Sequence, residues 1–301
     1  MLRQVVRDWA GADADLREFT PLAGGSINTT LLLTLADGTR AVLKITPHRV
    51  DRAYGDEVDQ LGLLRSAGVP VPEVLALHEG SLDRPFSYLL LAFVDGVDLH
   101  AARGKASPEA YDALQRELAD ALLRLHETSH THYARVSRQP VPQFDAWHAC
   151  FRDLFDGICQ EVVKAKVLPV RQRKVVARLH DRLDRLLACD QGPRLLHGDV
   201  WSTNLLCRPD ADGGWHLAAV IDPHCKFGSP EAELAYLDLF HTATPAFHKT
   251  YQRDRRLPPE YHQVRKPIYQ LYSLLNHVRL FGGAEYSKAL SAQADKVAAL
   301  V

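Results

Sequence analysis

The chain has 301 residues, of which 46% are hydrophobic and 24% charged, a balance that is typical of folded proteins and excludes wholesale disorder. Its 36 Lys and Arg residues are offset by 37 Asp and Glu residues, so no overall positive field favours binding to nucleic acid. The longest apolar stretches, such as residues 88–94, are far shorter than the roughly 20 residues that cross a bilayer, so we expect no membrane span. Charges within the first ten positions interrupt the apolar core that an export signal needs.

The cysteines and histidines lack the spacing of a disulfide framework or of a zinc site. The five cysteines are an odd number and include no C-x-x-C pair, which favours reduced thiols in a cytoplasmic protein. The fifteen histidines are scattered, and we interpret them as ordinary polar or partly buried residues rather than metal ligands. The cysteines are Cys150, Cys159, Cys189, Cys207 and Cys225.

Strand signals dominate the N-terminal third of the chain. Residues 29–36 and 40–46 are rich in Leu, Val, Ile and Thr, and the Asp37-Gly38 pair between them predicts a two-residue hairpin turn. A glycine-rich segment, residues 24–26, precedes this hairpin and would join two strands. Residues 51–67 have apolar positions at helical spacing and are followed by a glycine, which predicts a helix and its end.

Helical spacing dominates the remainder. Ser107 followed by Pro108 predicts an N-cap and a first helical residue, and apolar residues at helical spacing continue to Leu125. Further helices are predicted over residues 171–187, 271–281 and 289–300. The predicted fold class is therefore α+β with two lobes: a small, β-rich N-terminal lobe over residues 1–94 and a larger, mostly helical lobe over residues 95–301.

The most informative segment, residues 197–204, has the skeleton H-x-D-x-x-x-x-N between apolar flanks. In phosphotransferases such a loop supplies a base and a metal ligand that must converge on one γ-phosphate. We therefore predict that Asp199 accepts the proton of a substrate hydroxyl and that Asn204 binds a metal ion on the phosphates. Further along, Asp222 ends an apolar run that predicts a strand, which suits a second ligand for the same Mg²⁺ site.

Two features of the N-terminal lobe fit the same chemistry, although each alone has a plainer interpretation. Gly24, Gly25 and Ser26 could bring backbone N–H groups close to phosphates, but paired glycines usually form only a turn. Lys44 in a strand and Glu57 in the following helix match the phosphate-positioning pair of kinases, but either alone is more often a solvated side chain. Because these features precede the phosphotransferase loop in the right order, the sequence favours the functional interpretation and predicts ATP as a ligand.

Three segments carry a resemblance to a known family. Residues 197–204 read HGDVWSTN, close to a signature HGDLWSGN, and Trp201 is the residue that many more distant relatives lack. Residues 222–235 read DPHCKFGSPEAELA, similar to DPAxxxGxxEYDLA, and residues 269–277 read YQLYSLLNH, matching YQLxxxLNH. On these motifs the chain resembles the fructosamine kinase (ketosamine kinase) family, within the wider aminoglycoside phosphotransferase-like and protein kinase-like superfamily, over nearly its whole length.

The resemblance implies a kinase with a bilobal protein kinase-like fold and ATP bound between the lobes. It implies Asp199 as the base, Asn204 and Asp222 on Mg²⁺, and Lys44 on the ATP phosphates with Glu57 as its partner. The purine would bind the backbone around Ala92, Phe93 and Val94, where a strand meets the linker.

The acceptor implied by the family is a ketosamine, a sugar joined through its first carbon to an amine. A substrate amine is cationic near neutral pH, so its pocket should offer carboxylates or aromatic faces. Trp201 and Glu231 are the residues that we expect on this side of the site. The expected partner is thus an amine-bearing small molecule, and no feature of the sequence indicates an oligomeric state.

The chain departs from the family pattern at several positions. Thr203 replaces a Gly, Glu233 replaces an Asp, and an acidic hinge residue is replaced around Ala92. Some members have a cysteine in the glycine loop that is tied to redox control, and because Ser26 stands in that region we expect no such switch. These departures concern the choice of acceptor more than the phosphoryl transfer.

Other functions remain open from the sequence. Within the same chemistry the acceptor could be an aminoglycoside or another amino alcohol, because substrate loops vary while phosphate-binding residues stay recognisable. A non-catalytic kinase-like binding module is the alternative from another class, but the complete catalytic set favours an enzyme. A basic cluster is interpreted as a solvated face rather than an anion site. It comprises Lys249, Arg253, Arg255, Arg256, Arg265 and Lys266.

Overall fold

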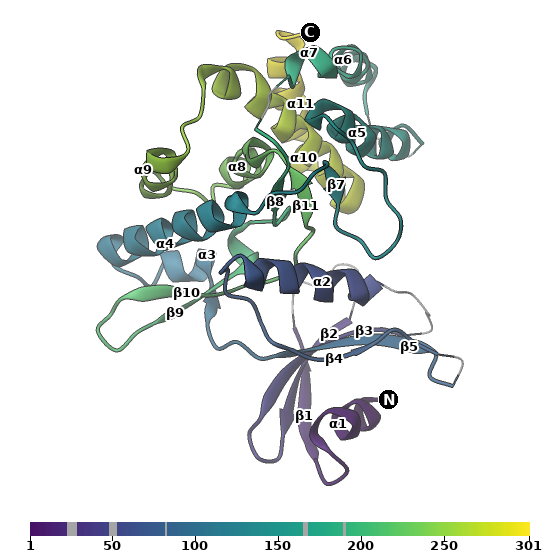
Figure 1. The fold of residues 1–301 in the computed structure, drawn as a ribbon, viewed down its shortest axis with the longest axis vertical. Helices are drawn as coiled ribbons and strands as arrows, with labels where there is room; N and C mark the ends of the chain where they lie inside the picture. The colour runs from purple at the N-terminus through teal and green to yellow at the C-terminus, as the bar shows by residue number, and fades with distance from the viewer. Residues whose placement is uncertain (23–28, 48–52, 82, 165–167, 189–190) are drawn as a thin grey trace.

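The N-terminal region is built on a five-stranded sheet in which every neighbouring pair of strands is antiparallel (Figure 1). The computed structural model describes residues 1–22, 29–47, 53–81, 83–164, 168–188 and 191–301. The strands are β1 (Leu16–Pro21), β2 (Thr29–Leu35), β3 (Arg40–Pro47), β4 (Val74–His78) and β5 (Phe86–Ala92), and their order in the sheet is β1-β2-β3-β5-β4.

Side chains alternate between the two faces of this sheet, and a helix covers each face. Leu43 and Ile45 of β3 are buried in one cluster with residues of α1 (Leu2–Ala10). On the other face, Val42 packs with the cluster that includes residues of α2 (Ala53–Ser66). Because the strand period is two residues, Lys44 shares the face of Val42 and is directed toward α2.

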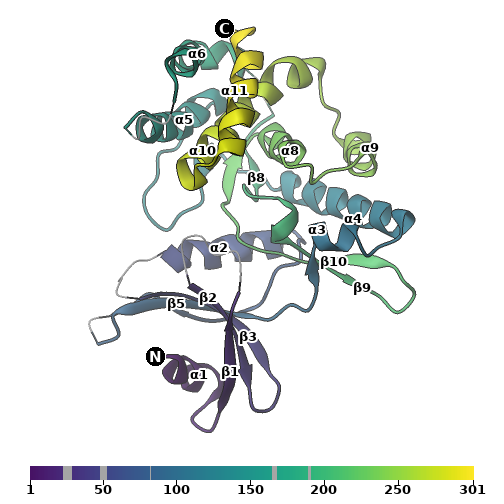
Figure 2. The ribbon, with the colours of Figure 1, turned by 180° about the vertical axis from the view of Figure 1, so that it is seen from behind.

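The C-terminal region is mostly helical, with two small three-stranded sheets between its helices and the N-terminal sheet (Figure 2). One sheet has the order β10-β9-β6 and the other β7-β11-β8. Their strands are β6 (Val97–Asp98), β7 (Ala134–Arg135), β8 (Arg194–Leu196), β9 (Leu205–Pro209), β10 (Trp215–Val220) and β11 (Lys226–Gly228). The largest buried cluster joins the helices of this region to both small sheets, and it also includes Leu64 of α2 and Val69.

The helices of this region follow the chain in the order α3 (Leu99–Arg103), α4 (Pro108–Glu127), α5 (Trp147–Lys164), α6 (Val170–His180), α7 (Leu183–Leu186), α8 (Pro230–Leu239), α9 (Pro245–Asp254), α10 (Lys266–Phe281) and α11 (Ala284–Ala298). A 3₁₀ turn, η1 (Ser202–Asn204), and a π-helical turn, η2 (Tyr261–Arg265), complete the set. Among the described residues, none of the helices is long and apolar enough to cross a bilayer.

The α+β fold class predicted from the sequence is confirmed, with a β-sheet N-terminal region and a helical C-terminal region. The predicted cap of α4 is present, because the Ser107 hydroxyl accepts a hydrogen bond from the Ala110 amide. The single helix predicted over residues 171–187 is wrong: a turn at Asp181 and Arg182 separates α6 from α7, while the apolar positions on either side remain buried. The division between lobes at residue 94 stays a prediction.

Candidate active site

The loop that follows β8 is organised around a buried histidine. His197 is completely buried, and its Nε2 lies 3.1 Å from the carbonyl oxygen of Ile221. Its Nδ1 lies 3.2 Å from the Asp199 amide nitrogen, which can only donate. The ring is therefore neutral, with its proton on Nε2 directed at Ile221. Burial lowers the pKa of His197 below that of an ordinary histidine, which agrees with this assignment.

The next residue must be a glycine. Gly198 has φ +85°, and a Cβ placed there would lie 2.2 Å from the carbonyl oxygen of His224. Any other side chain would clash with backbone as well as adopt an unfavourable conformation. This close approach joins the loop to the segment after β10, and the His224 amide also donates to the His197 carbonyl at 2.8 Å.

Both carboxylate oxygens of Asp199 accept a hydrogen bond from a neighbouring side chain. The Tyr236 hydroxyl donates to Oδ1 at 2.5 Å, and the Asn204 amide nitrogen donates to Oδ2 at 3.0 Å. Burial, together with the charge of Asp199, raises the pKa of Tyr236 well above its usual value, so the phenol keeps its proton and acts as the donor. The carboxylate is thereby oriented by two fixed groups, and Asn204 retains its amide oxygen as the atom that could bind a cation.

A second cluster joins the N-terminal sheet to the same loop. The Lys44 ammonium lies 2.5 Å from Glu57 Oε1 and also forms an ion pair with the Asp222 carboxylate. The pairing of Lys44 with Glu57 that the sequence predicted is therefore present. Burial alone would lower the pKa of Lys44, but the two carboxylates raise it, so the ammonium stays charged. Burial also raises the pKa of Glu57.

The backbone at Asp222 is unusual, since its φ of 56° lies in the left-handed region. A non-glycine residue in this region costs on the order of 1 kcal/mol or more and persists where its surroundings fix it. The preceding residue supplies the constraint: the Ile221 amide donates to the Asn204 carbonyl at 3.0 Å, and the Ile221 carbonyl accepts from His197. The two clusters are therefore linked through Ile221 and form one site.

Glu233 of α8 binds the backbone of the loop that begins at His197. This role was not predicted from the sequence. The Glu233 carboxylate accepts hydrogen bonds from the backbone amides of His197 at 3.3 Å and Gly198 at 2.6 Å, and it lies 2.9 Å from His126 Nε2. Burial would raise the pKa of Glu233, but the hydrogen bonds and the neighbouring histidines lower it below its usual value. Only the buried face of α8 reveals this role, because an acidic residue at a core position requires partners.

Trp201 and Glu231, the two residues expected near the acceptor, lie in different environments. Glu231 is completely buried, and both of its oxygens are held by Arg265, at 2.5 and 2.8 Å. Gln191 adds a further hydrogen bond at 3.1 Å, so this carboxylate is directed into the core instead of toward an acceptor. Trp201 is partly exposed, and its ring contacts Phe240 with 6.3 Å between centroids.

The remaining expectations fall on the linker, the glycine loop and the basic cluster. The Ala92 amide is already used, since it donates to the Glu73 carbonyl at 2.8 Å. The guanidinium of Arg40 lies over the Phe93 ring at 4.1 Å. Gly24, Gly25 and Ser26 lie outside the described residues. Within the basic cluster, Arg265 is buried on Glu231 and Lys266 pairs with Asp238 at 2.6 Å.

Among the described residues, no group of three or more His, Cys, Asp or Glu side chains is arranged to hold a metal ion. A Mg²⁺ site in a phosphotransferase needs fewer protein ligands, because phosphate oxygens and water complete the shell. Four cysteines in the described part of the chain are free, and burial raises the pKa of Cys150, Cys159 and Cys207 to about 12.

Comparison with known proteins gives consistent matches over most of the chain. The sequence profile described as fructosamine kinase matches residues 1–298. The protein named probable ketoamine kinase YniA, from Escherichia coli strain K12, is 30% identical over 269 residues, which are 87% of this chain and 86% of that protein. A probable ketoamine kinase from Klebsiella aerogenes is 31% identical over 291 residues, 91% of this chain and 90% of the relative.

Solved structures show the same fold. A candidate fructosamine-3-kinase from Thermobifida fusca has a TM-score of 0.73 and 25% identity, and the match covers 98% of each chain. A thermostable mutant of aminoglycoside phosphotransferase APH(4)-Ia, solved with AMP-PNP and hygromycin B, has a TM-score of 0.68 and 21% identity. That match covers 99% of this chain and 97% of the other.

The neutral state of His197 is directly measurable. We expect nitrogen-15 NMR of the histidine-labelled protein to show the Nε2–H tautomer at pH 6, because burial lowers the pKa of this ring and an unfolded histidine titrates near 6.5. The unfolded chain then binds a proton that the folded chain does not, so the contribution of this site to the free energy of unfolding should fall as pH drops below about 6.5. A doubly protonated His197 ring at pH 6, assigned with His197→Gln, would contradict the assignment.

Removing the charge of Glu233 should destabilise the loop. Glu233→Gln keeps the volume but loses one of the acceptors that serve the His197 and Gly198 amides, and we expect the free energy of unfolding to fall by about 2 kcal/mol. Urea unfolding measures this value. Glu285→Gln, at an exposed position in the first turn of α11, is the control and should change the free energy by less than about 0.5 kcal/mol. Equal effects of the two variants would refute the role given to Glu233.

Proposed function

The chain belongs to the fructosamine kinase family, a family of phosphotransferases, and we propose that it transfers the γ-phosphoryl group of ATP, with Mg²⁺, to a hydroxyl of a ketosamine. The observation that carries the proposal is the union of two clusters in one site. One cluster orients the carboxylate of Asp199, and the other holds Lys44 between Glu57 and Asp222. Phosphoryl transfer depends mainly on such positioning and on electrostatic stabilisation of the phosphates.

Lys44 is the residue that we propose for the nucleotide phosphates. Its ammonium is charged and mostly buried, and it reaches the site from the middle strand of the N-terminal sheet. Glu57 limits the conformations of this side chain by pairing with it from α2. A charge held in one place at low solvent exposure interacts more strongly with a phosphate than a solvated one. The purine would bind backbone groups of Phe93 and Val94, beyond the occupied amide of Ala92.

Asn204 and Asp222 are the proposed Mg²⁺ ligands, and the chemistry of their donors fits. Mg²⁺ prefers oxygen atoms, and it commonly takes one or two side chains together with phosphate oxygens. Asp222 offers a carboxylate, and Asn204 offers its amide oxygen because its nitrogen is used by Asp199. When bound, the ion would neutralise charge on the phosphates.

Asp199 is the proposed base for the acceptor. It would accept the proton of the acceptor hydroxyl while that oxygen bonds to the γ-phosphorus and the bond from phosphorus to the bridging oxygen of ADP breaks. Each carboxylate oxygen has a second acceptor site in addition to the one used by Tyr236 or Asn204. The two hydrogen bonds therefore orient the base without removing its capacity to accept a proton.

An aromatic group beside Asp199 supports an amine-bearing acceptor. Tyr236, whose hydroxyl reaches Asp199, contacts Phe240 with 4.8 Å between ring centroids, and Phe240 contacts Trp201 and His277. Aromatic faces attract ammonium groups by about 0.5–2 kcal/mol. We propose that these aromatic side chains, instead of Glu231, contact the substrate amine, because the carboxylate of Glu231 is paired with Arg265. We propose Trp201 as the substrate-side residue, and residues 1–94 and 95–301 as the nucleotide and acceptor lobes.

The two aspartates should differ in their kinetic effects. Asp199→Asn should lower kcat by about 10²–10⁴-fold, the usual contribution of a general base, and leave ATP affinity nearly unchanged. Asp222→Asn should also weaken Mg²⁺-dependent ATP binding, because it removes a ligand charge. Steady-state kinetics and calorimetry with ATP measure these effects. Asp212→Asn, at an exposed position in the turn between β9 and β10, is the control. Full activity of Asp199→Asn would overturn the assignment.

The acceptor is tested by competition. We expect a higher kcat/KM for a ketosamine such as fructosyl-lysine than for kanamycin or a simple amino alcohol, measured as ADP release in the presence of Mg²⁺. Trp201→Ala should raise KM for the ketosamine and leave KM for ATP unchanged, because the aromatic face serves only the acceptor. A clear preference for kanamycin would replace the proposal with an aminoglycoside phosphotransferase. No Mg²⁺-dependent turnover or ATP binding would favour a non-catalytic module.

A further inference from the structure

A loop of the C-terminal region binds the outer face of α2, the helix that carries Glu57. The loop follows β7 and comprises residues 136–139, which we call the α2 strap. In both ribbon views α2 lies between the five-stranded sheet and the helical region (Figures 1 and 2). The contacts of the strap therefore cross from one region of the protein to the other.

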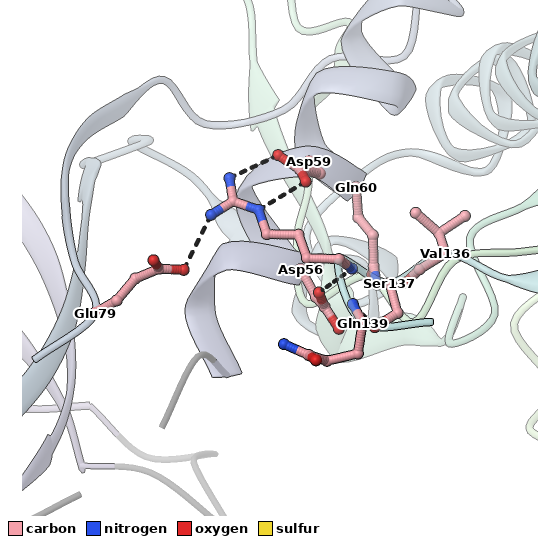
Figure 3. Close-up of polar contacts among 8 residues, drawn as sticks. Asp56, Asp59, Gln60, Glu79, Val136, Ser137 and Gln139 are labelled. Atoms are coloured by element: carbon pink, nitrogen blue, oxygen red, sulfur yellow. Dashed lines mark hydrogen bonds and ion pairs between the residues drawn. The ribbon is translucent and has the colours of Figure 1, made fainter. Parts of the chain in front are cut away.

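Arg138 supplies most of these contacts. Its guanidinium binds Asp59 through two parallel hydrogen bonds of 2.8 Å and binds Glu79 at 3.0 Å, while its backbone amide donates to Asp56 at 2.7 Å (Figure 3). Asp56 and Asp59 belong to α2, and Glu79 directly follows β4 of the sheet. One side chain thus connects the strap, the helix and the sheet. The paired geometry with Asp59 is the arrangement in which an arginine binds a carboxylate most strongly.

A glycine inside α2 makes room for this arginine. A Cβ on Gly55 would lie 2.5 Å from Nη1 of Arg138 and 2.5 Å from Oε1 of Glu79. Glycine inside a helix is unfavourable relative to alanine, and the backbone of Gly55 is helical, so no positive φ requires a glycine there. The guanidinium of Arg138 occupies the space that a side chain at position 55 would need. The glycine thus supports the contact between Arg138 and α2 independently of the hydrogen bonds.

A buried glutamine adds a second connection beside the arginine. Gln60 of α2 is only 7% exposed, and its Nε2 donates to the Val136 carbonyl at 2.9 Å while its Oε1 accepts from the Cys225 amide at 3.0 Å. The Val136 amide in turn donates to the Cys225 carbonyl at 3.0 Å. Cys225 lies three positions after Asp222. The strap therefore ties α2 to the segment that carries a proposed metal ligand.

The two faces of α2 have different partners. Asp56, Asp59 and Gln60 are spaced by three and four residues, so they share the face toward the strap. Glu57 has the same spacing to Tyr54 and Leu61, which are buried against the sheet. Contacts on the strap face set the rotation of the helix, while Leu64 near its C-terminal end is buried in the cluster of the C-terminal region. Together these contacts fix the position of Glu57 relative to Lys44.

We propose that Arg138 is a positioning residue, which holds α2 against the C-terminal region so that Glu57, Lys44 and Asp222 meet in the geometry that binds the nucleotide phosphates. The proposal rests on the proposed function. Arg138 itself does not reach the reacting groups: it acts through α2. Its loss should therefore affect the nucleotide side of the reaction and leave binding of the acceptor intact.

The test compares Arg138→Ala with Arg84→Ala. Arg84 forms an ion pair of 2.5 Å with Asp8 at similar exposure, 39% against 33% for Arg138, but that pair lies within the N-terminal region. We expect Arg138→Ala to lower kcat/KM for ATP about tenfold, the size of coupling that a positioning contact gives, with KM for the acceptor unchanged. Arg84→Ala should leave both constants unchanged.

Conservative and partner variants separate positioning from general loss of stability. Arg138→Lys, which keeps the charge but loses the paired geometry, should retain part of the activity. Asp59→Asn should have part of the effect of Arg138→Ala, which also removes the contact with Glu79. The double variant should be no worse than Arg138→Ala alone, because that variant already removes the contact with Asp59. Gly55→Ala should also lower kcat/KM for ATP, since its Cβ displaces the guanidinium. The proposal would be overturned if the losses of kcat/KM in Arg138→Ala and Asp59→Asn added up in the double variant. It would also be overturned if Arg84→Ala lost kcat/KM in proportion to its drop in melting temperature, as Arg138→Ala does.

A measurement that needs no turnover distinguishes this proposal from the proposed function. Hydrogen exchange should be faster in the α2 amides of Arg138→Ala than in the full-length native protein, with exchange in α4 unchanged. If the native protein phosphorylates no acceptor, the proposed function fails. The exchange result still tests whether Arg138 holds α2 in place. If the native enzyme is active but Arg138→Ala matches it in both α2 exchange and kcat/KM for ATP, the positioning role fails.

Discussion

The ammonium of Lys44, held between the carboxylates of Glu57 and Asp222, is the interaction on which the arrangement of the site depends. Its three members come from the sheet, from α2 and from the segment after β10. Lys44 and Glu57 are mostly buried, whereas Asp222 is partly exposed. Removing the charge of Lys44 or of Glu57 leaves its buried partner without full compensation, which is costly in a region of low dielectric constant. The set also carries one more negative than positive charge, which suits a site proposed to receive a divalent cation with the phosphates.

The loop that bears Asp199 is fixed by a different means, a buried polar network with few groups left unpaired. His197 uses both ring nitrogens, and Glu233 accepts from two backbone amides. Networks of this kind define one geometry when all their members are satisfied and become unfavourable when one is lost. Rigid support beneath the base is a requirement of the proposed chemistry, since a base that moves by a fraction of an ångström loses much of its effect.

The sequence predicted the elements and pairs that depend on local pattern. The hairpin around Asp37-Gly38, the cap at Ser107 and the pairing of Lys44 with Glu57 were accessible because turn chemistry, helix caps and strand periodicity are local or follow a known order. The two-residue length predicted for the hairpin turn is wrong: β2 ends at Leu35 and β3 begins at Arg40, and of the pair only Gly38 has positive φ. The contacts of Glu231 and Glu233 were not accessible. Both are acidic residues in the first turn of α8, a position that usually indicates a solvated helix end, and only packing against Arg265 and the loop backbone reveals them as core residues.

Polar contacts connect the two regions of the protein next to the site. Arg138, Asp59 and Gln60 make directional contacts between them. Beside these contacts, Leu64 of α2 is buried in the apolar cluster of the helical region, while the sheet has a cluster of its own with α1. Hydrogen bonds and ion pairs of this kind contribute modestly to stability but specify orientation. The proposed binding of a nucleotide between the two regions would benefit from this arrangement, because apolar packing keeps α2 on the helical region while directional contacts set its orientation.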